Sequence, residues 1–247
     1  MSEAEIVAIR CLRDNYAYLL HANGRTVLFD APEAEPILQA LAERGWRLDQ
    51  ILLTHHHDDH VGAVPELVAA TGATVTGAAA DAHRLPPLDR ALRPGDVTDA
   101  AGLPAQVIDV PGHTIGHIAF YVPDARAAFT GDSLTAIGCG RIFEGDAPMM
   151  WASLQRLNAL PAETLICSGH DYCAGNGAFA LTVDPDNADL RDRLQATATA
   201  ARPCAPVTLA EERATNPFLR APALAATLGL DDAEQAFAAL RAMKDNF

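Results

Sequence analysis

One short segment of the sequence carries most of the residues that could do chemistry. Four of the nine histidines lie within six residues, directly after the apolar run Gln50–Thr54. An H-x-H-x-D-H frame is formed by His55, His57, Asp59 and His60. Imidazole and carboxylate groups are ligands for zinc, iron and manganese. Residues 55 and 57 can project the same way from an extended loop, while 59 and 60 turn toward a second centre. A second frame, with His56 and Asp58 as ligands, stays open.

Three further residues of ligand type occupy equivalent places in the sequence. Each follows a predicted strand and a turn that contains glycine: His113 after Pro111-Gly112, Asp132 after Gly131, and His170 after Gly169. Functional sites in layered α/β folds gather at the carboxyl ends of strands. Together with the first segment, these positions supply five histidines and two aspartates, enough to bind two metal ions.

Two metal ions would define the class of reaction. Cations about 3.5–4 Å apart can share a hydroxide and hold an electrophilic carbonyl. Zinc brings the pKa of bound water to about 7, so no serine or cysteine nucleophile is needed. A nearby metal also stabilises the oxyanion that forms on the carbonyl. The expected reaction is hydrolysis at an acyl carbon or at phosphorus, and the ligands alone do not choose between them.

Short β-type runs dominate the first two thirds of the chain and place these residues at strand ends. The predicted strands are 5–11, 16–21, 25–30, 50–54, 74–77, 106–110, 118–122, 127–130 and 164–167, and the predicted helices there are 36–44, 64–71 and 151–160. After about residue 173 the pattern is helical, over 189–201 and 231–242. We therefore predict a β-rich α/β domain over residues 1–173 and a small helical domain over residues 174–247.

The composition excludes several classes of protein. The 247 residues are 49% hydrophobic, and no run approaches the roughly 18 apolar residues of a membrane span. The net charge of −14 argues against binding to nucleic acid or to an anionic membrane. An anionic substrate would need a local cluster of cations, and Lys244 is the single lysine. Five cysteines without a CxxC pair, and an N-terminus without a continuous apolar stretch, favour a reducing compartment; we expect a cytoplasmic protein.

The segments around the candidate ligands resemble the metallo-β-lactamase superfamily, in its order. They are His55–His60, Pro111–Thr114, Thr130–Asp132 and Gly169-His170. The resemblance implies an α/β fold, the αββα four-layer sandwich, here with a small C-terminal helical domain. It implies one metal on His55, His57 and His113, the other on Asp59, His60 and His170, and Asp132 as the bridge. Asp59 and Asp132 are the implied catalytic residues, and His117 is interpreted as structural.

Further motifs, spread over the whole chain, narrow the resemblance to the glyoxalase II (hydroxyacylglutathione hydrolase) family. They are Asp14–Tyr16 (DNY), Gly138–Gly145 (GCGRIFEG), Gly169–Tyr172 (GHDY), Asn216–Arg220 (NPFLR) and the ending Arg241–Phe247 (RAMKDNF). Such a family implies a thioesterase that cleaves S-D-lactoylglutathione to D-lactate and glutathione, the second step of methylglyoxal detoxification. It implies two divalent metal ions per chain, with zinc expected and iron or manganese as alternatives. We expect a monomer.

The same resemblance assigns residues to the glutathione part of the substrate. Arg141, Arg241 and Lys244 match family positions for its two carboxylates, and Phe143 and Tyr172 match positions that line its pocket. Arginine can bind a carboxylate bidentately, whereas lysine acts as a point charge. The chain departs from the family pattern where Phe143 replaces a frequent tyrosine, Arg141 a frequent lysine, and Asp30-Ala31-Pro32 a D-P-G turn.

Other functions are compatible with a metal centre of this kind. Another thioesterase or a lactonase would differ only in its acyl or thiol group. A non-hydrolytic di-iron protein needs a flavin or another redox partner, and the sequence has no flavodoxin-like extension. A nuclease is disfavoured by the net charge of −14 and the lack of a basic strip.

Overall fold

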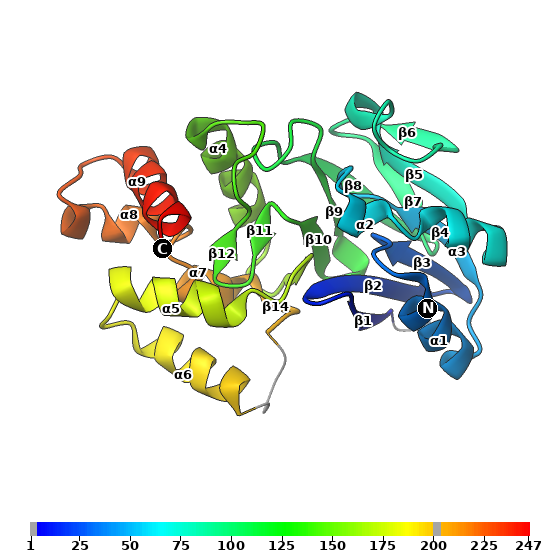
Figure 1. Ribbon diagram of the computed structural model, residues 1–247, viewed down its shortest axis with the longest axis horizontal. Coiled ribbons are helices and arrows are strands. Elements are labelled where there is room, and N and C mark those ends of the chain that lie inside the picture. The colour runs from blue at the N-terminus through cyan, green and yellow to red at the C-terminus, as the bar shows by residue number, and fades with distance from the viewer. Residues whose placement is uncertain (1–3, 200–203) are drawn as a thin grey trace. The chain divides into compact units, whose positions relative to one another are not determined.

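The computed structural model describes residues 4–199 and 204–247 of the chain. They form two compact units, one of the described residues of 1–109 with Gly116–Gly131 and one of Val110–Ile115 with the described residues of 132–247. The first unit holds most of the strands, and the second holds most of the helices (Figure 1). Within the described residues, no helix combines the length and apolarity that crossing a membrane requires.

A six-stranded mixed sheet forms one layer of the first unit. Its strands, in spatial order, are β1 (Glu5–Cys11), β2 (Asn15–Ala22), β3 (Arg25–Phe29), β4 (Leu48–Leu52), β5 (Thr74–Ala78) and β6 (Arg90–Leu92). The first three are antiparallel, and β3 to β6 are parallel. The β2–β3 hairpin follows from Asn23 and Gly24, whose φ angles of 52° and 72° fit a two-residue type I′ turn. The parallel pairs β3–β4 and β4–β5 are joined by crossover connections that run through α1 (Ala34–Arg44) and α3 (Val64–Thr71).

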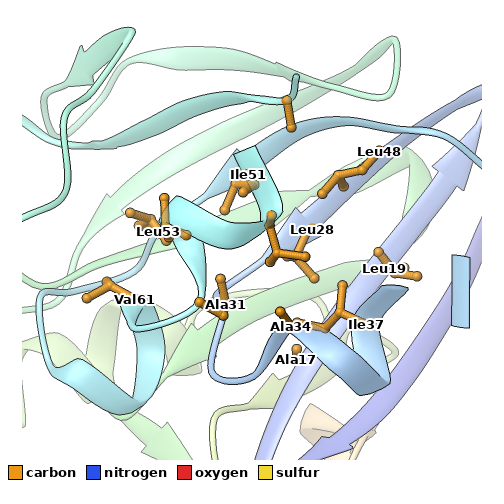
Figure 2. Packing of buried hydrophobic residues seen from close by; sticks show 14 of the residues in the cluster. Ala17, Leu19, Leu28, Ala31, Ala34, Ile37, Leu48, Ile51, Leu53 and Val61 are labelled. Atoms are coloured by element: carbon orange, nitrogen blue, oxygen red, sulfur yellow. The ribbon is translucent and has the colours of Figure 1, made fainter. Parts of the chain in front are cut away.

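The helices of the first unit pack on one face of this sheet. Ile37 of α1 and Val61 of α2 (Asp58–Val61) belong to one buried cluster with Leu28 and Ile51 of the sheet (Figure 2). Helix α1 is followed by Gly45, whose φ of 65° is the left-handed conformation common after a last helical turn. Full burial of a leucine-sized side chain contributes on the order of 1.5–3 kcal/mol. The cluster therefore fixes β4 and the segment that follows it.

Four antiparallel strands of the same unit form a second layer. In spatial order they are β10 (Ala127–Gly131), β9 (Ile118–Val122), β8 (Leu103–Asp109) and β7 (Val97–Ala100). The ring of Phe29 stacks on that of Phe129, with centroids 3.4 Å apart, and lies 5.7 Å from that of Phe120. Because side chains alternate along a strand, Leu28 packs against the helices while Phe29 packs against the second sheet. Two short 3₁₀ turns, η1 (Ala79–Asp81) and η2 (Pro123–Ala125), complete the described elements of this unit.

The second unit consists of helices and short strands. The helices are α4 (Ala147–Asn158), α5 (Cys173–Val183), α6 (Ala188–Ala198), α7 (Leu209–Thr215), α8 (Ala221–Leu224), η3 (Ala226–Leu228) and α9 (Ala233–Asp245). The antiparallel strand pairs are β11 (Leu134–Thr135) with β12 (Gly138–Cys139), and β13 (Leu165–Ser168) with β14 (Val207–Thr208). Side-chain oxygens of Asp146, Asn187, Thr208 and Asp232 cap four of the helices by accepting from a backbone N–H three residues later.

The mixed sheets with helices and the helical C-terminal region confirm the predicted fold class. The predicted helix over 189–201 is α6, although residues 200 and 201 lie outside the described residues. The sequence pattern does not predict β6, β7, α5 or α7. Helix α5 contains two glycines, which are poor helix formers, but a Cβ on Gly177 would lie 2.2 Å from Leu194. Close packing of α5 on α6 therefore overrides the local propensity. The domain boundary near residue 173 stays a prediction.

Candidate active site

The histidine segment joins the end of β4 to helix α2. Nε2 of His55 lies 3.1 Å from Nδ1 of His57, so these two side chains project toward each other, as the spacing predicts. Helix α2 begins at Asp58, which places Asp59 and His60 in its first turn. There, Nε2 of His60 lies 3.7 Å from Oδ2 of Asp59. The segment thus presents two pairs of ligand-type groups, one from the loop and one from the helix.

A buried carboxylate, Asp30, orients two of these histidines. Its Oδ1 accepts the Thr54 N–H at 2.8 Å, and its Oδ2 accepts the Thr54 hydroxyl at 2.8 Å. Nδ1 of His60 lies 2.9 Å from the same Oδ2. The Thr54 hydroxyl, having donated to Asp30, accepts from Nδ1 of His55 at 3.0 Å. Both imidazoles therefore carry their proton on Nδ1 and present the lone pair of Nε2, the form that binds a metal.

Asp30 itself has a ligand atom within 4.8 Å of those of His55 and His60. Because its two oxygens already accept from Thr54 and His60, we assign it an orienting role rather than that of a ligand. Its φ of 57° is the left-handed conformation, which aspartate tolerates better than most residues. The sequence indicates only that the turn at this position departs from the family pattern.

Asn15 orients the Asp59 side chain by hydrogen bonds, as Asp30 orients the histidines. Its side-chain amide donates to Oδ2 of Asp59 at 2.9 Å and to the Asp59 backbone carbonyl at 3.1 Å. Asn15 is buried at the start of β2, whereas the Asp59 side chain is 41% exposed. The amide therefore fixes one carboxylate oxygen and the backbone beside it. The sequence predicts no role for Asn15 beyond its place in the DNY motif.

Replacing Asn15 with alanine is expected to weaken zinc binding by about 10-fold, because partners of this kind orient the ligand. The fold should be retained, since the contact lies at the edge of α2. Competition for zinc against a chromophoric chelator measures the effect. Gln39→Ala, on the exposed face of α1, serves as the control. Unchanged zinc affinity in Asn15→Ala would show that Asp59 needs no such partner.

The middle histidine of the segment has a different partner. Nδ1 of His56 lies 3.1 Å from Oδ2 of Asp81, a fully buried carboxylate. Oδ1 of Asp81 accepts from Nε and Nη2 of Arg84, at 3.2 and 2.5 Å. Gly116 lies so close that a Cβ there would be 2.2 Å from the Asp81 carboxyl carbon. This contact, together with the exposure of Asp58, disfavours the frame with His56 and Asp58 as ligands.

His117 packs against the histidine segment. Its ring is fully buried and stacks on that of His55, with centroids 4.6 Å apart and planes 14° apart. Nδ1 of His117 lies 3.1 Å from the carbonyl of Ile118, and the Ile118 N–H donates to the Thr54 carbonyl. These contacts suit the structural role that the sequence predicts for this residue.

The second unit brings together the other three predicted ligands. Oδ2 of Asp132 lies 3.4 Å from Nε2 of His113 and 3.3 Å from Nε2 of His170. All three residues are buried. Nδ1 of His113 lies 2.7 Å from the carbonyl oxygen of Arg141. A carbonyl can only accept, so Nδ1 of His113 carries the proton and Nε2 offers its lone pair.

These donor sets fit a divalent metal ion. Three imidazoles have a partner that fixes the proton on Nδ1, and one oxygen of Asp132 faces two Nε2 atoms. Nitrogen and carboxylate donors of this kind suit zinc, iron or manganese. The division of the seven ligands between two ions, and the number of ions, stay predictions.

The C-terminal end of the second unit gathers positive charge. Nε of Arg141 and Nη2 of Arg241 lie 3.6 and 2.8 Å from the same oxygen of Asp245. Burial, and then the charges of Arg241 and Arg141, lower the pKa of Lys244. The Lys244 ammonium donates to the Gly175 carbonyl at 3.2 Å. Three cations with one aspartate form a local positive cluster on an acidic protein.

The predicted substrate residues differ in how they are exposed. The side chains of Phe143 and Tyr172 lie at the surface, against His113 and His170 respectively, with ring centroids 5.3 and 4.5 Å apart. Arg141 is exposed, but Arg241 is buried and donates to the Cys139 carbonyl at 3.0 Å. Arg241 therefore holds the Gly138–Gly145 motif, and a direct contact with substrate stays a prediction for it.

Comparisons with known proteins agree with this geometry. The chain matches the family model of the metallo-beta-lactamase superfamily over residues 12–170 and that of the hydroxyacylglutathione hydrolase C-terminus over residues 171–247. It is 60% identical to a hydroxyacylglutathione hydrolase of Fuscovulum blasticum, over 98% of both chains. Among solved structures it resembles TTHA1623 in a di-iron-bound form, with 30% identity, a TM-score of 0.65 and coverage of 87% of this chain and 100% of that one. It also resembles ETHE1 from Myxococcus xanthus, with 28% identity, a TM-score of 0.66 and coverage of 96% and 90%.

Proposed function

Because this chain belongs to the hydroxyacylglutathione hydrolases of the metallo-β-lactamase superfamily, we propose that it hydrolyses S-D-lactoylglutathione to D-lactate and glutathione. The observation that supports this substrate is the cluster of Arg141, Arg241 and Lys244, with the exposed ring of Phe143 two residues after Arg141. Glutathione carries two carboxylates, which require such a cluster on a protein with a net charge of −14.

Two divalent metal ions are the proposed cofactors, with zinc expected and iron or manganese as alternatives. Following the family pattern, we assign His55, His57 and His113 to one ion, Asp59, His60 and His170 to the other, and Asp132 to both. The fixed Nδ1 protons of His55, His60 and His113 support the assignment, because each leaves Nε2 as the donor. Once bound, the ions supply Lewis acidity toward the thioester carbonyl and lower the pKa of water to about 7.

The protein's own groups bind and orient the substrate. Arg141 and Lys244 attract the glutathione carboxylates, and Tyr172 and Phe143 offer apolar faces beside His170 and His113. Cys139 is not a nucleophile in this proposal, because burial raises its pKa to about 11 despite the Arg241 charge. Its thiol stays protonated near neutral pH, which leaves water as the attacking group.

The direct test is whether purified protein hydrolyses S-D-lactoylglutathione. The reaction is monitored by the loss of thioester absorbance, and the metal content of the same sample is measured. Turnover with about two ions per chain is expected. Two ions without turnover would reject the proposed substrate while leaving the metal centre intact. A homoserine lactone and an unrelated thioester are assayed in parallel, and a preference for the lactone would favour a lactonase instead.

Replacing Lys244 with alanine is expected to raise KM about 10-fold and to change kcat little, because the contact is remote from the carbonyl. Lys244→Arg keeps the charge and should restore most of the affinity. Steady-state kinetics measure both variants. A large loss of kcat at unchanged KM would indicate a structural role for Lys244.

The lowered pKa of Lys244 adds a pH dependence. The ammonium loses its proton at a lower pH than an ordinary lysine, so KM should rise earlier on the alkaline side. In Lys244→Arg this rise should disappear. Since Lys244 is the only lysine, reductive ¹³C-methylation labels one side chain and the N-terminus, and NMR titration can read its pKa directly.

We also propose a cytoplasmic monomer. The five cysteines are buried thiols, which suits a reducing compartment. Light scattering of the purified protein tests the oligomeric state, and fractionation of cells tests the location.

A further inference from the structure

One carboxylate of the second unit lies outside every role assigned so far. Glu212 of α7 is fully buried, and its two oxygens have separate partners. Oε1 accepts from Nη2 of Arg193 at 2.6 Å. Oε2 accepts from the Ile137 N–H and from the Asn216 side-chain amide, each at 3.0 Å. The first oxygen thus belongs to a buried ion pair, and the second reaches a loop that lies 75 positions away in the sequence.

On the Arg193 side, the carboxylate meets a buried guanidinium. Burial disfavours the guanidinium charge, but the acidic groups around it, Glu212 first and then Glu211, together outweigh burial and raise the pKa of Arg193. Arg193 also donates to the Thr215 hydroxyl at 2.6 Å. An ion pair without access to water is costly to bury and costly to break. Arg193 therefore holds the Glu212 carboxylate in place, with Oε2 turned toward the loop.

The Oε2 side holds a strained backbone segment. Ile137 has a φ of 55°, a conformation that a β-branched residue rarely adopts and that persists only where neighbours impose it. Glu212 binds its N–H, while the Asn216 amide donates to the Gly138 carbonyl at 2.9 Å. Asn176 donates to the Ala136 carbonyl at 2.9 Å. Three consecutive residues are therefore fixed by buried polar side chains of α5, α7 and the residue that follows α7.

The fixed segment leads to Arg141, whose carbonyl contacts His113, and both are predicted functional residues. The Arg141 carbonyl accepts the proton of Nδ1 of His113 at 2.7 Å, and the Arg141 side chain belongs to the positive cluster. A Cβ on Gly140 would lie 2.1 Å from the Asp132 carbonyl oxygen and 2.9 Å from Nδ1 of His113. The segment is therefore tightly packed at Gly140, and a shift at Ile137 would move the Arg141 carbonyl that accepts from His113.

We propose that Glu212 is a positioning residue that holds the segment 136–141, so that the Arg141 carbonyl orients His113 and the Arg141 side chain faces the substrate. The proposal rests on the proposed function for the roles of His113 and Arg141. It gives α7 a role in metal binding, whereas the cations of α9 have a proposed role in substrate binding.

Glu212→Gln tests the proposal, with Arg193→Lys as the matched control. Both variants disturb the buried pair, but Arg193→Lys leaves the two contacts of Oε2 in place. The apparent melting temperature of the metal-free protein, the zinc Kd from chelator competition, and KM and kcat are measured for each. Glu212→Gln should weaken zinc binding by about 10-fold or more and raise KM, as loss of an outer partner does. Arg193→Lys should lower the melting temperature and leave the zinc Kd within about twofold of the parent.

Equal zinc affinity in both variants and the parent would overturn the proposal, because Glu212 would then serve stability alone. If Glu212→Gln does not fold, Asn216→Ala removes the bond to the Gly138 carbonyl and spares the ion pair. Parent-like zinc affinity and KM in that variant would equally overturn it. If the wild type binds zinc without hydrolysing lactoylglutathione, the proposed function fails, while the comparison of zinc affinities still decides the role of Glu212.

Discussion

Replacing Asp132 with alanine is expected to remove metal from the protein and to lower kcat by roughly 10³-fold. One oxygen of this carboxylate faces Nε2 of His113 and Nε2 of His170, at 3.4 and 3.3 Å. Alanine would leave the two imidazoles without the anion that offsets the charge of the bound ions. A centre of this kind contributes several kcal/mol to stabilising charge in the transition state, and about 4 kcal/mol corresponds to a factor of about 10³.

Elemental analysis and steady-state kinetics on the same preparation check this expectation. Asp124→Ala, an exposed aspartate of η2, is the control and should keep both the metal and the activity. Asp132→Asn separates charge from shape, because an amide keeps one acceptor oxygen but loses the anion. An Asp132→Ala enzyme with full activity and two ions would show that the bridging carboxylate has been misassigned.

Replacing Asp30 with alanine is expected to weaken zinc binding by about 10- to 100-fold, since it removes the partner of His60 and, through Thr54, that of His55. The imidazoles would then be free to carry their proton on Nε2, which blocks metal binding. The buried Thr54 N–H would also lose its acceptor, at a cost of about 1–3 kcal/mol in unfolding free energy.

Asp49→Ala is a matched control for the stability part of this effect. Oδ2 of Asp49 accepts the Thr26 N–H at 2.9 Å, a contact similar to that of Asp30 with Thr54 but made to a residue of β3. Both variants should unfold at lower urea concentration than the parent, but only Asp30→Ala should lose zinc affinity. If the two variants bind zinc equally well, Asp30 is a structural residue and the histidine tautomers are set by other contacts.

The sequence alone predicts the residues that could bind metal because their spacing is local. His55, His57, Asp59 and His60 lie so close in the chain that any loop followed by a helical turn brings their side chains near one another. The pattern of strand, glycine turn and ligand-type residue likewise places His113, Asp132 and His170 at strand ends. The family motifs then indicate the reaction, and the comparisons confirm the family.

The sequence does not predict the residues that orient these ligands, because they come from distant parts of the chain. Asp30 is 24 positions from Thr54, Asn15 is 44 from Asp59, and Glu212 is 75 from Ile137. An aspartate or asparagine has many uses in a turn or a cap, so its type predicts no particular partner. Only the paired strands and packed helices determine which buried N–H or imidazole each one meets.

The burial of the basic residues assigned to the substrate also depends on the tertiary structure. Arg141 and Arg241 are the same residue type in two of the family motifs, and the resemblance assigns them one role. In the structure the first is exposed and the second is buried against the Cys139 carbonyl and Phe218, with its guanidinium carbon 5.1 Å from the ring centre. The sequence by itself determined the ligand types, the family and the class of chemistry, because these depend on side-chain identity and short spacing. The tertiary structure alone decided which nitrogen carries each proton and which cation faces solvent, because these depend on the partners that folding brings within hydrogen-bond distance.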